Sequence, residues 1–159
     1  MGSLSIKELS RRGTVPRFAY EKVAAKVLPG WDLSLAFVGP AKALALNKKL
    51  RNADYTPNVL SYEVGKKSGE ILICLSVAEK QSAAYDMSKE NFVLYLFIHG
   101  LLHLKGMAHG VTMETRERKL LGLFTKSPVR THSSHVPAHS NRNRHRHLPS
   151  KNGGRRGTR

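Results

Sequence analysis

The sequence contains a single cysteine, Cys74, among its 159 residues. An intrachain disulfide is therefore excluded, and the composition fits a reducing compartment. Cys74 lies in the apolar run between Glu70 and Leu75. We therefore interpret this residue as a small buried hydrophobic side chain rather than as a nucleophile or a metal ligand.

Long apolar runs are also missing. No stretch approaches the roughly 20 apolar residues that a transmembrane helix needs, and residues 1–12 lack the apolar core of a signal peptide. The longest apolar stretch, Phe92 to Leu104, contains two histidines. These absences predict a cytoplasmic protein that has no membrane partner.

Acidic residues are scarce, because 27 Lys and Arg oppose only 11 Asp and Glu, for a net charge of +16. Nine of the basic residues and no acidic one lie from Lys126 onward, which leaves 18 minus 11, or +7, for the chain up to Thr125. Basic side chains that neutralise phosphates release counterions and so favour a polyanionic partner. Nucleic acid is the leading interpretation. The alternative is that the positive charge only aids solubility.

The composition changes near residue 126. The earlier part is long enough for one domain with a hydrophobic core. The later part is dominated by Ser, Asn, His, Arg and Gly and has too few aliphatic residues to offset the conformational entropy of the chain. We therefore predict one folded domain over residues 1–125 and a basic disordered tail over residues 126–159.

Apolar periodicity and turn residues give a coarse prediction of the elements. Strands are predicted at 4–7, 32–38, 58–64 and 70–75, and helices from Pro16 to about 28 and at 41–51, 76–85, 92–104 and 112–124. Residues 65–69 indicate a hairpin with a longer loop. Ser76 and Ser88 are expected to cap helices, with Glu79 completing a capping box at the first. The order predicts an α+β domain in which a small mixed sheet packs against helices.

The most informative stretch runs from His99 to His109 and reads HGLLHLKGMAH. His99 and His103 are four residues apart on the predicted central apolar helix, so their rings project from one face. Gly106 permits a left-handed turn, after which His109 can return as a third ligand. A lone histidine on an apolar helix is more often a core residue, but the third histidine favours a metal site. Three protein ligands leave a position for water, as in catalytic zinc sites.

The same spacing occurs in metallopeptidases that carry a glutamate directly after the first histidine as general base. Here that position is Gly100. Glu114 and Glu117 follow the motif, but we place them on a plain solvated helix. Without a carboxylate to take the proton of the attacking water, peptide hydrolysis is a weak alternative.

Two separated blocks resemble the YbeY family of bacterial metal-dependent endoribonucleases. One is the family's H-G-x-L-H-L-x-G-x-x-H motif around the three histidines. The other is L-N-x-x-x-R, matched by Leu46 to Arg51, followed by elements that resemble T-[DN]-V-L-S-F at residues 56–62 and G-[DE]-I at residues 69–71. The resemblance covers nearly all of residues 1–121. It implies a metal-dependent endoribonuclease in ribosomal RNA maturation, with ribosomal RNA or the small ribosomal subunit as partner. We predict that the metal is zinc, from the three histidines, and that the substrate is single-stranded, because a flexible strand lets the scissile bond align for in-line attack.

The chain also departs from the family pattern. Met107 and Ala108 occupy the places of the family's Tyr-Asp before the last histidine, so a carboxylate that could support a ligand histidine is missing. Glu63 stands where the family has proline, and Pro57 is inserted before Asn58.

Arg51 is the residue that the resemblance places beside the metal. A guanidinium can hold a phosphate through two parallel hydrogen bonds and stabilise developing charge on its oxygens. Taken alone, the sequence favours a solvated charge at a helix end for Arg51, and the resemblance reverses that preference. The main alternative function is a non-catalytic RNA-binding or ribosome-binding protein in which zinc only stabilises the fold.

Overall fold

The computed structural model describes residues 1–10 and 14–125, so the predicted tail lies outside the described residues. The strands are β1 (Leu4–Glu8), β2 (Asp32–Val38), β3 (Val59–Gly65) and β4 (Ser68–Cys74). The helices are α1 (Tyr20–Val27), α2 (Pro40–Arg51), α3 (Leu75–Gln81), the 3-10 helix η1 (Ser82–Tyr85), α4 (Lys89–Leu104) and α5 (Val111–Phe124). No helix in the described ranges is long and apolar enough to span a membrane.

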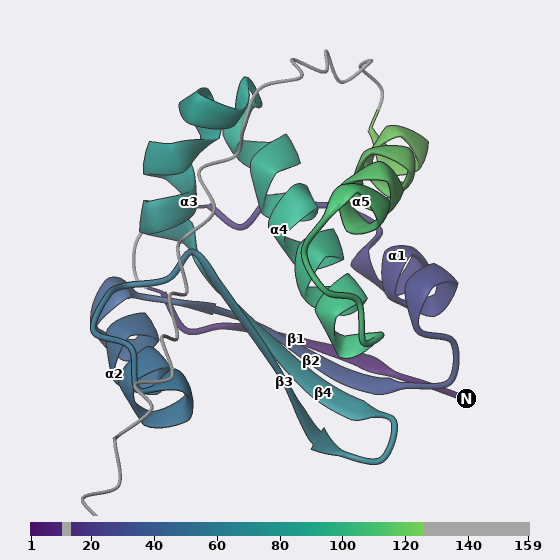
Figure 1. Ribbon diagram of the computed structural model, residues 1–159, viewed down its shortest axis with the longest axis horizontal. Helices are drawn as coiled ribbons and strands as arrows, with labels where there is room; N and C mark the ends of the chain where they lie inside the picture. The colour runs from purple at the N-terminus through teal and green to yellow at the C-terminus, as the bar shows by residue number, and fades with distance from the viewer. Residues whose placement is uncertain (11–13, 126–159) are drawn as a thin grey trace, which may run out of the picture.

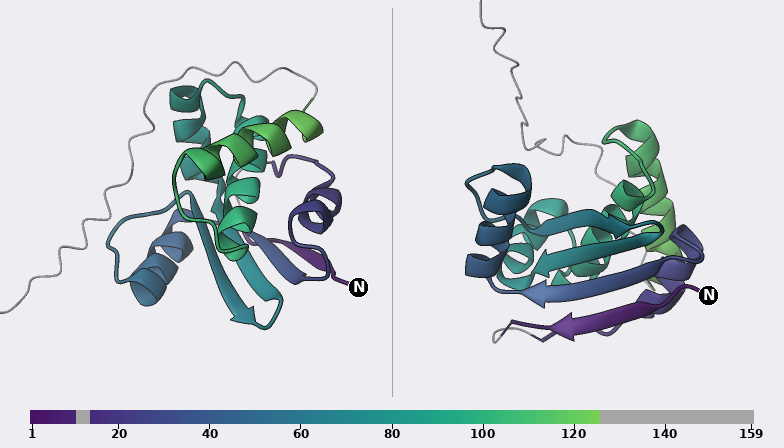
Figure 2. Two further views of the ribbon diagram at one scale, coloured as in Figure 1. Left: turned by 45° about the vertical axis from the view of Figure 1, so that its right-hand side comes forward. Right: turned by 90° about the horizontal axis from the view of Figure 1, so that it is seen from below.

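The four strands form one mixed sheet in the order β1-β2-β4-β3. β1 and β4 both run parallel to β2, whereas β3 is antiparallel to β4. Helices α1, α4 and α5 lie over one face of this sheet, and α2 lies on the other side (Figures 1 and 2). The predicted α+β class with a small mixed sheet is confirmed.

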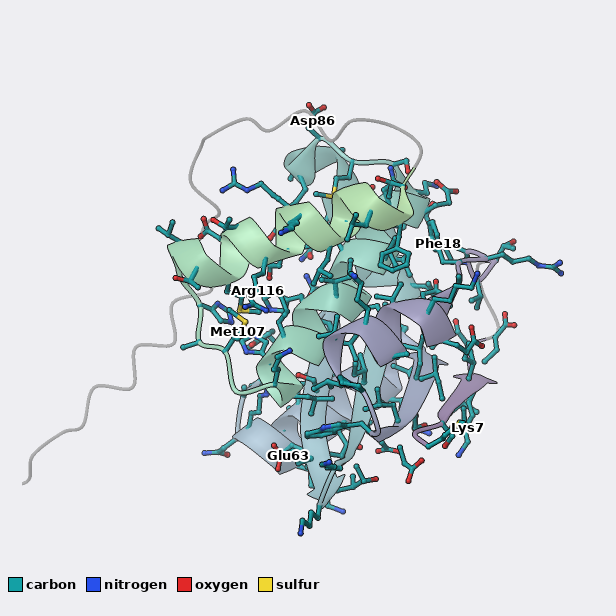
Figure 3. The ribbon with its side chains drawn as sticks, turned by 90° about the vertical axis from the view of Figure 1, so that its right-hand side faces the viewer. Lys7, Phe18, Glu63, Asp86, Met107 and Arg116 are labelled. Carbon is teal, nitrogen blue, oxygen red and sulfur yellow. The ribbon has the colours of Figure 1, made fainter. Side chains whose placement is uncertain are left out.

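The central helix is α4, and its sequence explains its position. Apolar residues surround most of this helix, so it is buried among other elements rather than lying on the surface. Phe97, Ile98 and Leu101 are fully buried against the sheet and the neighbouring helices. Phe18, from the segment before α1, packs against the same core (Figure 3). A smaller apolar cluster, which includes Ala43, lies between α2 and the opposite face of the sheet.

Helix α4 is capped and terminated by the residues that the sequence predicted for these roles. The Ser88 hydroxyl accepts a hydrogen bond from the backbone N–H of Asn91, which satisfies one free donor of the first turn. After the helix, Gly106 has a φ of 88°, in the left-handed region that glycine adopts without steric cost. The predicted cap and the predicted exit turn are therefore both confirmed.

Three local predictions were wrong. The first helix begins at Tyr20 rather than at Pro16, and the Tyr20 hydroxyl instead donates to the Pro16 carbonyl over 2.9 Å. The hairpin loop is short, because Gly65 pairs with Ser68 and only two residues form the turn. Ser76 does not cap α3, which starts one residue earlier directly from β4.

Candidate metal centre and cleft

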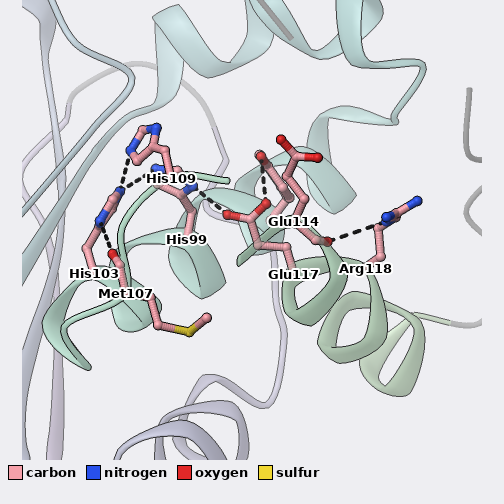
Figure 4. Close-up of polar contacts among 8 residues, drawn as sticks. His99, His103, Met107, His109, Glu114, Glu117 and Arg118 are labelled. Carbon is pink, nitrogen blue, oxygen red and sulfur yellow. Dashed lines mark hydrogen bonds and ion pairs between the residues drawn. The ribbon is translucent and has the colours of Figure 1, made fainter. Parts of the chain in front are cut away.

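The three histidines of the sequence motif converge on one point (Figure 4). His99 and His103 project from α4, and His109 returns from the connection between α4 and α5. Each offers one ring nitrogen, and these three atoms all lie within 4.8 Å of one another. Among the described residues this is a cluster that could hold a metal ion.

The spacing of the ring nitrogens fits a tetrahedral metal site. His103 Nε2 lies 3.0 Å from His99 Nε2 and 2.7 Å from His109 Nε2. Ligand nitrogens at about 2.0–2.1 Å from a tetrahedral zinc ion are separated by roughly 3.3 Å, so the two nitrogen pairs that include His103 need to separate by only a few tenths of an ångström to take the ion. The donor set of three imidazoles is also the kind that zinc takes in catalytic sites. The residues present therefore fit the group that the sequence predicts.

The Nδ1 atoms of His99 and His103, which point away from the cluster, make hydrogen bonds that determine the tautomers of these rings. His99 Nδ1 donates to Glu117 Oε1 over 2.7 Å, and His103 Nδ1 donates to the Met107 carbonyl over 3.0 Å. A backbone carbonyl can only accept, so His103 Nδ1 carries the hydrogen and the neutral ring keeps its lone pair on Nε2, and a carboxylate acceptor favours the same tautomer at His99. Such contacts orient ligand histidines and raise their basicity.

Glu117 is the functional residue that the sequence analysis misplaced. It is only 4% exposed and lies under α4, whereas Glu114 on the same helix is exposed. Its second oxygen accepts from the Tyr95 hydroxyl over 3.2 Å. Burial and the nearby Glu117 carboxylate raise the pKa of Tyr95, which keeps this donor protonated. The solvated-helix interpretation of Glu117 was therefore wrong.

Electrostatics within the cluster favour the neutral rings of His103 and His109. Burial and then the neighbouring His99 and His109 lower the pKa of His103 to about 4. Burial also lowers the pKa of His109, and Arg51 acts in the same direction on both rings. Neutral imidazoles are the form that binds metal ions, so His103 and His109 are ready to act as ligands at neutral pH.

A cleft of about 120 Å³ opens beside the three histidines. Arg51, at the end of α2, lines this cleft together with the segment that leads into β3. Ser61 in β3 lies in the same lining, as does Gln81 at the end of α3. The structure thus brings Arg51 and the histidines together, although they are far apart in the sequence.

The position after the first histidine has no room for a catalytic carboxylate. A Cβ at Gly100 would lie 3.1 Å from Ile71 Cγ2, because α4 packs closely on β4 at this point. The carboxylate of Glu117 contacts the cluster, but its two oxygens are hydrogen-bonded to Tyr95 and to His99 Nδ1. His99 Nδ1 is on the opposite side of that ring from Nε2, which faces His103. The structure therefore does not supply the general base of the peptidase motif.

The comparisons with known proteins agree with this geometry. A family model described as Endoribonuclease YbeY matches residues 6–124. The chain belongs to the YbeY family. Endoribonuclease YbeY of Thiobacillus denitrificans is 32% identical over 112 residues, which are 64% of this chain and 76% of that protein. Endoribonuclease YbeY of Solibacter usitatus is 33% identical over 122 residues, 72% of this chain and 82% of that protein.

A solved structure shares the fold. The solution structure of TM1509 from Thermotoga maritima aligns with a TM-score of 0.53 at 20% identity, over 75% of this chain and 87% of that chain. Membership of the YbeY family makes this chain an endoribonuclease with RNA as its substrate class, and the histidine cluster is consistent with metal dependence.

The missing aspartate of the YbeY motif has a structural counterpart here. Ala108 cannot accept a hydrogen bond through its side chain, but the carbonyl of the preceding Met107 already accepts from His103. Glu117 serves His99 in the same way. Within the described part of the chain, two of the three ligand rings, His99 and His103, therefore have a hydrogen-bond acceptor at Nδ1.

Proposed function

We propose that this YbeY-family chain is a zinc-dependent, single-strand-selective endoribonuclease that matures ribosomal RNA in the cytoplasm. His99, His103 and His109 hold the ion in this proposal, and Arg51 holds the phosphate that is cut. The supporting observation is the convergence of three imidazole nitrogens at the edge of a cleft that Arg51 also lines.

In the proposed reaction, different residues bind the metal, orient its ligands and bind the phosphate. When bound, a zinc ion with three histidine ligands supplies an activated water, because the metal lowers the pKa of that water to about 7. Glu117 and the Met107 carbonyl keep the Nε2 lone pairs of His99 and His103 turned toward the ion. The Arg51 guanidinium binds two phosphate oxygens and stabilises the negative charge that grows on them during attack.

Single-stranded RNA suits this site better than duplex. A flexible strand lets the scissile bond turn in line with the attacking water, whereas a duplex holds its backbone in a fixed A-form path. The basic charge of the chain up to Thr125 favours contacts along the phosphate backbone. Ribosomal RNA, or the small ribosomal subunit, is the partner that the family resemblance implies.

The test is RNA cleavage by the purified full-length protein, with and without a chelator, together with elemental analysis. We expect about one zinc per chain and cleavage that stops on chelation and returns with added zinc. His103→Ala should lose both metal and activity. Met107→Leu is the matched control, because His103 hydrogen-bonds to the backbone carbonyl of that residue, which the substitution keeps.

The alternatives predict different results. A protein without any transition metal after zinc-supplemented expression would refute the metal centre. Cleavage that persists in His103→Ala and in the presence of chelator would show that the histidines do not catalyse it. One zinc per chain and tight RNA binding without cleavage would favour the non-catalytic RNA-binding or ribosome-binding protein.

A further inference from the structure

Helix α2 buries the side chain of a polar residue, Asn47. This residue is 0% exposed and lies one turn before Arg51. Ala43, one turn earlier on the same face of α2, belongs to the apolar cluster between this helix and the sheet. A buried amide costs free energy unless it is hydrogen-bonded, and an apolar side chain would pack here without that cost. Packing alone therefore does not explain Asn47.

The amide of Asn47 makes a hydrogen bond that leads toward the cleft. Its Nδ2 donates over 2.9 Å to the backbone carbonyl of Tyr55, in the segment between α2 and β3. Its Oδ1 is buried and has no hydrogen-bond partner within the described residues. A buried acceptor that loses its hydration without compensation lowers stability. The contribution of this amide to the molecule therefore comes from its donor.

The segment that Asn47 holds forms part of the cleft. The chain reverses at Asn52, which has a left-handed φ of 52°, and the N–H of Ala53 donates to the Asn47 carbonyl over 3.4 Å. Three residues that follow in this segment line the cleft beside Arg51 and the histidines. We call them the substrate wall: Thr56, Pro57 and Asn58.

The two ends of the substrate wall are anchored differently. At the far end, the Asn58 carbonyl accepts a hydrogen bond of 2.9 Å from the backbone N–H of Cys74, at the end of β4. At the near end, Asn47 supplies a hydrogen bond from a fully buried side chain. The ion pair of 2.7 Å between Lys48 and Asp54 also joins α2 to this segment, but both side chains are exposed. Exposed ion pairs contribute little, so the near end depends mainly on Asn47.

We propose that Asn47 is a positioning residue for the RNA substrate, whose buried amide holds the substrate wall in place before RNA binds. This inference rests on the proposed endoribonuclease function. Asn47 is not among the residues that line the cleft, so it acts through the Tyr55 carbonyl. A wall that is already ordered reduces the free energy lost on binding, because the substrate does not have to order it.

The test removes the donor and measures cleavage by holoenzyme of a fluorescent single-stranded RNA oligonucleotide that is cut at one position. Asn47→Leu keeps a branched side chain of the same number of heavy atoms, and Asn47→Ala removes the donor without adding bulk. If the wall is in place in only a fraction of the molecules, the apparent affinity for RNA falls by that fraction, whereas the bound complex is unchanged. Both variants should therefore raise KM by about 5- to 30-fold and change kcat by less than about twofold.

A purely structural role of Asn47 predicts a different result. Loss of folded protein lowers the concentration of active enzyme, so it reduces the apparent kcat and leaves KM unchanged. Zinc content, measured by elemental analysis, should be the same in both variants and the wild type, because the wall holds no metal ligand. Asp54→Asn is the matched control, since it removes the exposed ion pair from the same segment and should not raise KM. A wild-type KM in the folded variants, or a fall in kcat alone, would overturn the proposal.

A failure of this proposal and a failure of the ribonuclease function can be told apart. If the wild type cleaves RNA and the variants keep its KM, the ribonuclease stands and Asn47 only fills α2. If the wild type does not cleave, fluorescence anisotropy with the same oligonucleotide still reports binding. Affinity that is about 5- to 30-fold weaker in both variants, and unchanged or tighter in Asp54→Asn, would support the positioning role. Equal affinity of wild type, Asn47→Leu and Asn47→Ala would overturn it.

Discussion

Glu117 offers the sharpest test of how the metal centre is built. Its carboxylate is 4% exposed and accepts the Nδ1–H of His99 over 2.7 Å, so it holds that ring with Nε2 directed at the other two histidines. Glu117→Gln keeps an oxygen acceptor of the same shape and removes only the charge. Glu117→Ala removes the acceptor and leaves two donors, His99 and Tyr95, without it.

The geometry gives the expected magnitudes. A buried hydrogen bond to a charged acceptor contributes about 1 kcal/mol more than one to a neutral acceptor, so Glu117→Gln should weaken zinc binding about fivefold. Loss of the supporting acceptor altogether typically weakens metal affinity by about 10- to 100-fold, which is the expectation for Glu117→Ala. The affinities should therefore fall in the order wild type, Gln variant, Ala variant.

The assay is competition for zinc with a chromogenic chelator at pH 7, with the fold of each variant checked by circular dichroism. Glu114→Gln is the matched control, because Glu114 lies one turn earlier on α5 and is exposed. It should bind zinc like wild type. If Glu117→Gln and Glu117→Ala, both folded, also bind zinc like wild type, Glu117 only fills space under α4 and our account of the ligand orientation is refuted.

Three further outcomes are expected. Arg51→Lys should keep the fold and the zinc but lose much of the cleavage rate, because an ammonium cannot make two-point contact with a phosphate. Equal single-turnover rates for the variant and the wild type would show that Arg51 is only a solvated surface charge. Ala108→Asp should tighten zinc binding in the chelator assay if a further carboxylate supports a ligand ring, and unchanged affinity would mean that the Met107 carbonyl is sufficient. Truncation after Thr125 should weaken RNA binding most at low salt and flatten its salt dependence without moving the cleavage positions; moved positions would place specificity in the removed segment.

The sequence was sufficient where a strong local signal determines the structure. The period of apolar residues in α4, its Ser88 cap and its exit at Gly106 all follow from short-range chemistry. The convergence of His99, His103 and His109 follows from the same local rules. All of these signals lie between residues 88 and 109, so they can be recognised without knowledge of tertiary contacts.

Features that depend on tertiary packing were harder to predict. Glu117 was assigned to solvent because of its charge, yet it lies four residues after Met113 and four before Leu121, both of which are buried on the inner face of α5. That spacing indicated that the Glu117 carboxylate points toward the core. What the sequence could not show is that Tyr95 and His99 on α4 donate hydrogen bonds to it. Likewise, α1 begins only at Tyr20, whose hydroxyl donates back to the Pro16 carbonyl, and no periodicity in the sequence encodes that contact.

The three histidines and the carboxylate that contacts His99 come from one continuous stretch, residues 99–117, whereas Arg51 comes from α2, far earlier in the chain. Local sequence therefore brings the three rings together, but tertiary packing brings Arg51 to the cleft that they line. Helix α2 packs on the opposite face of the sheet through a small apolar cluster that includes Ala43. A substitution in that cluster could thus displace Arg51 from the histidines while the three rings stay together.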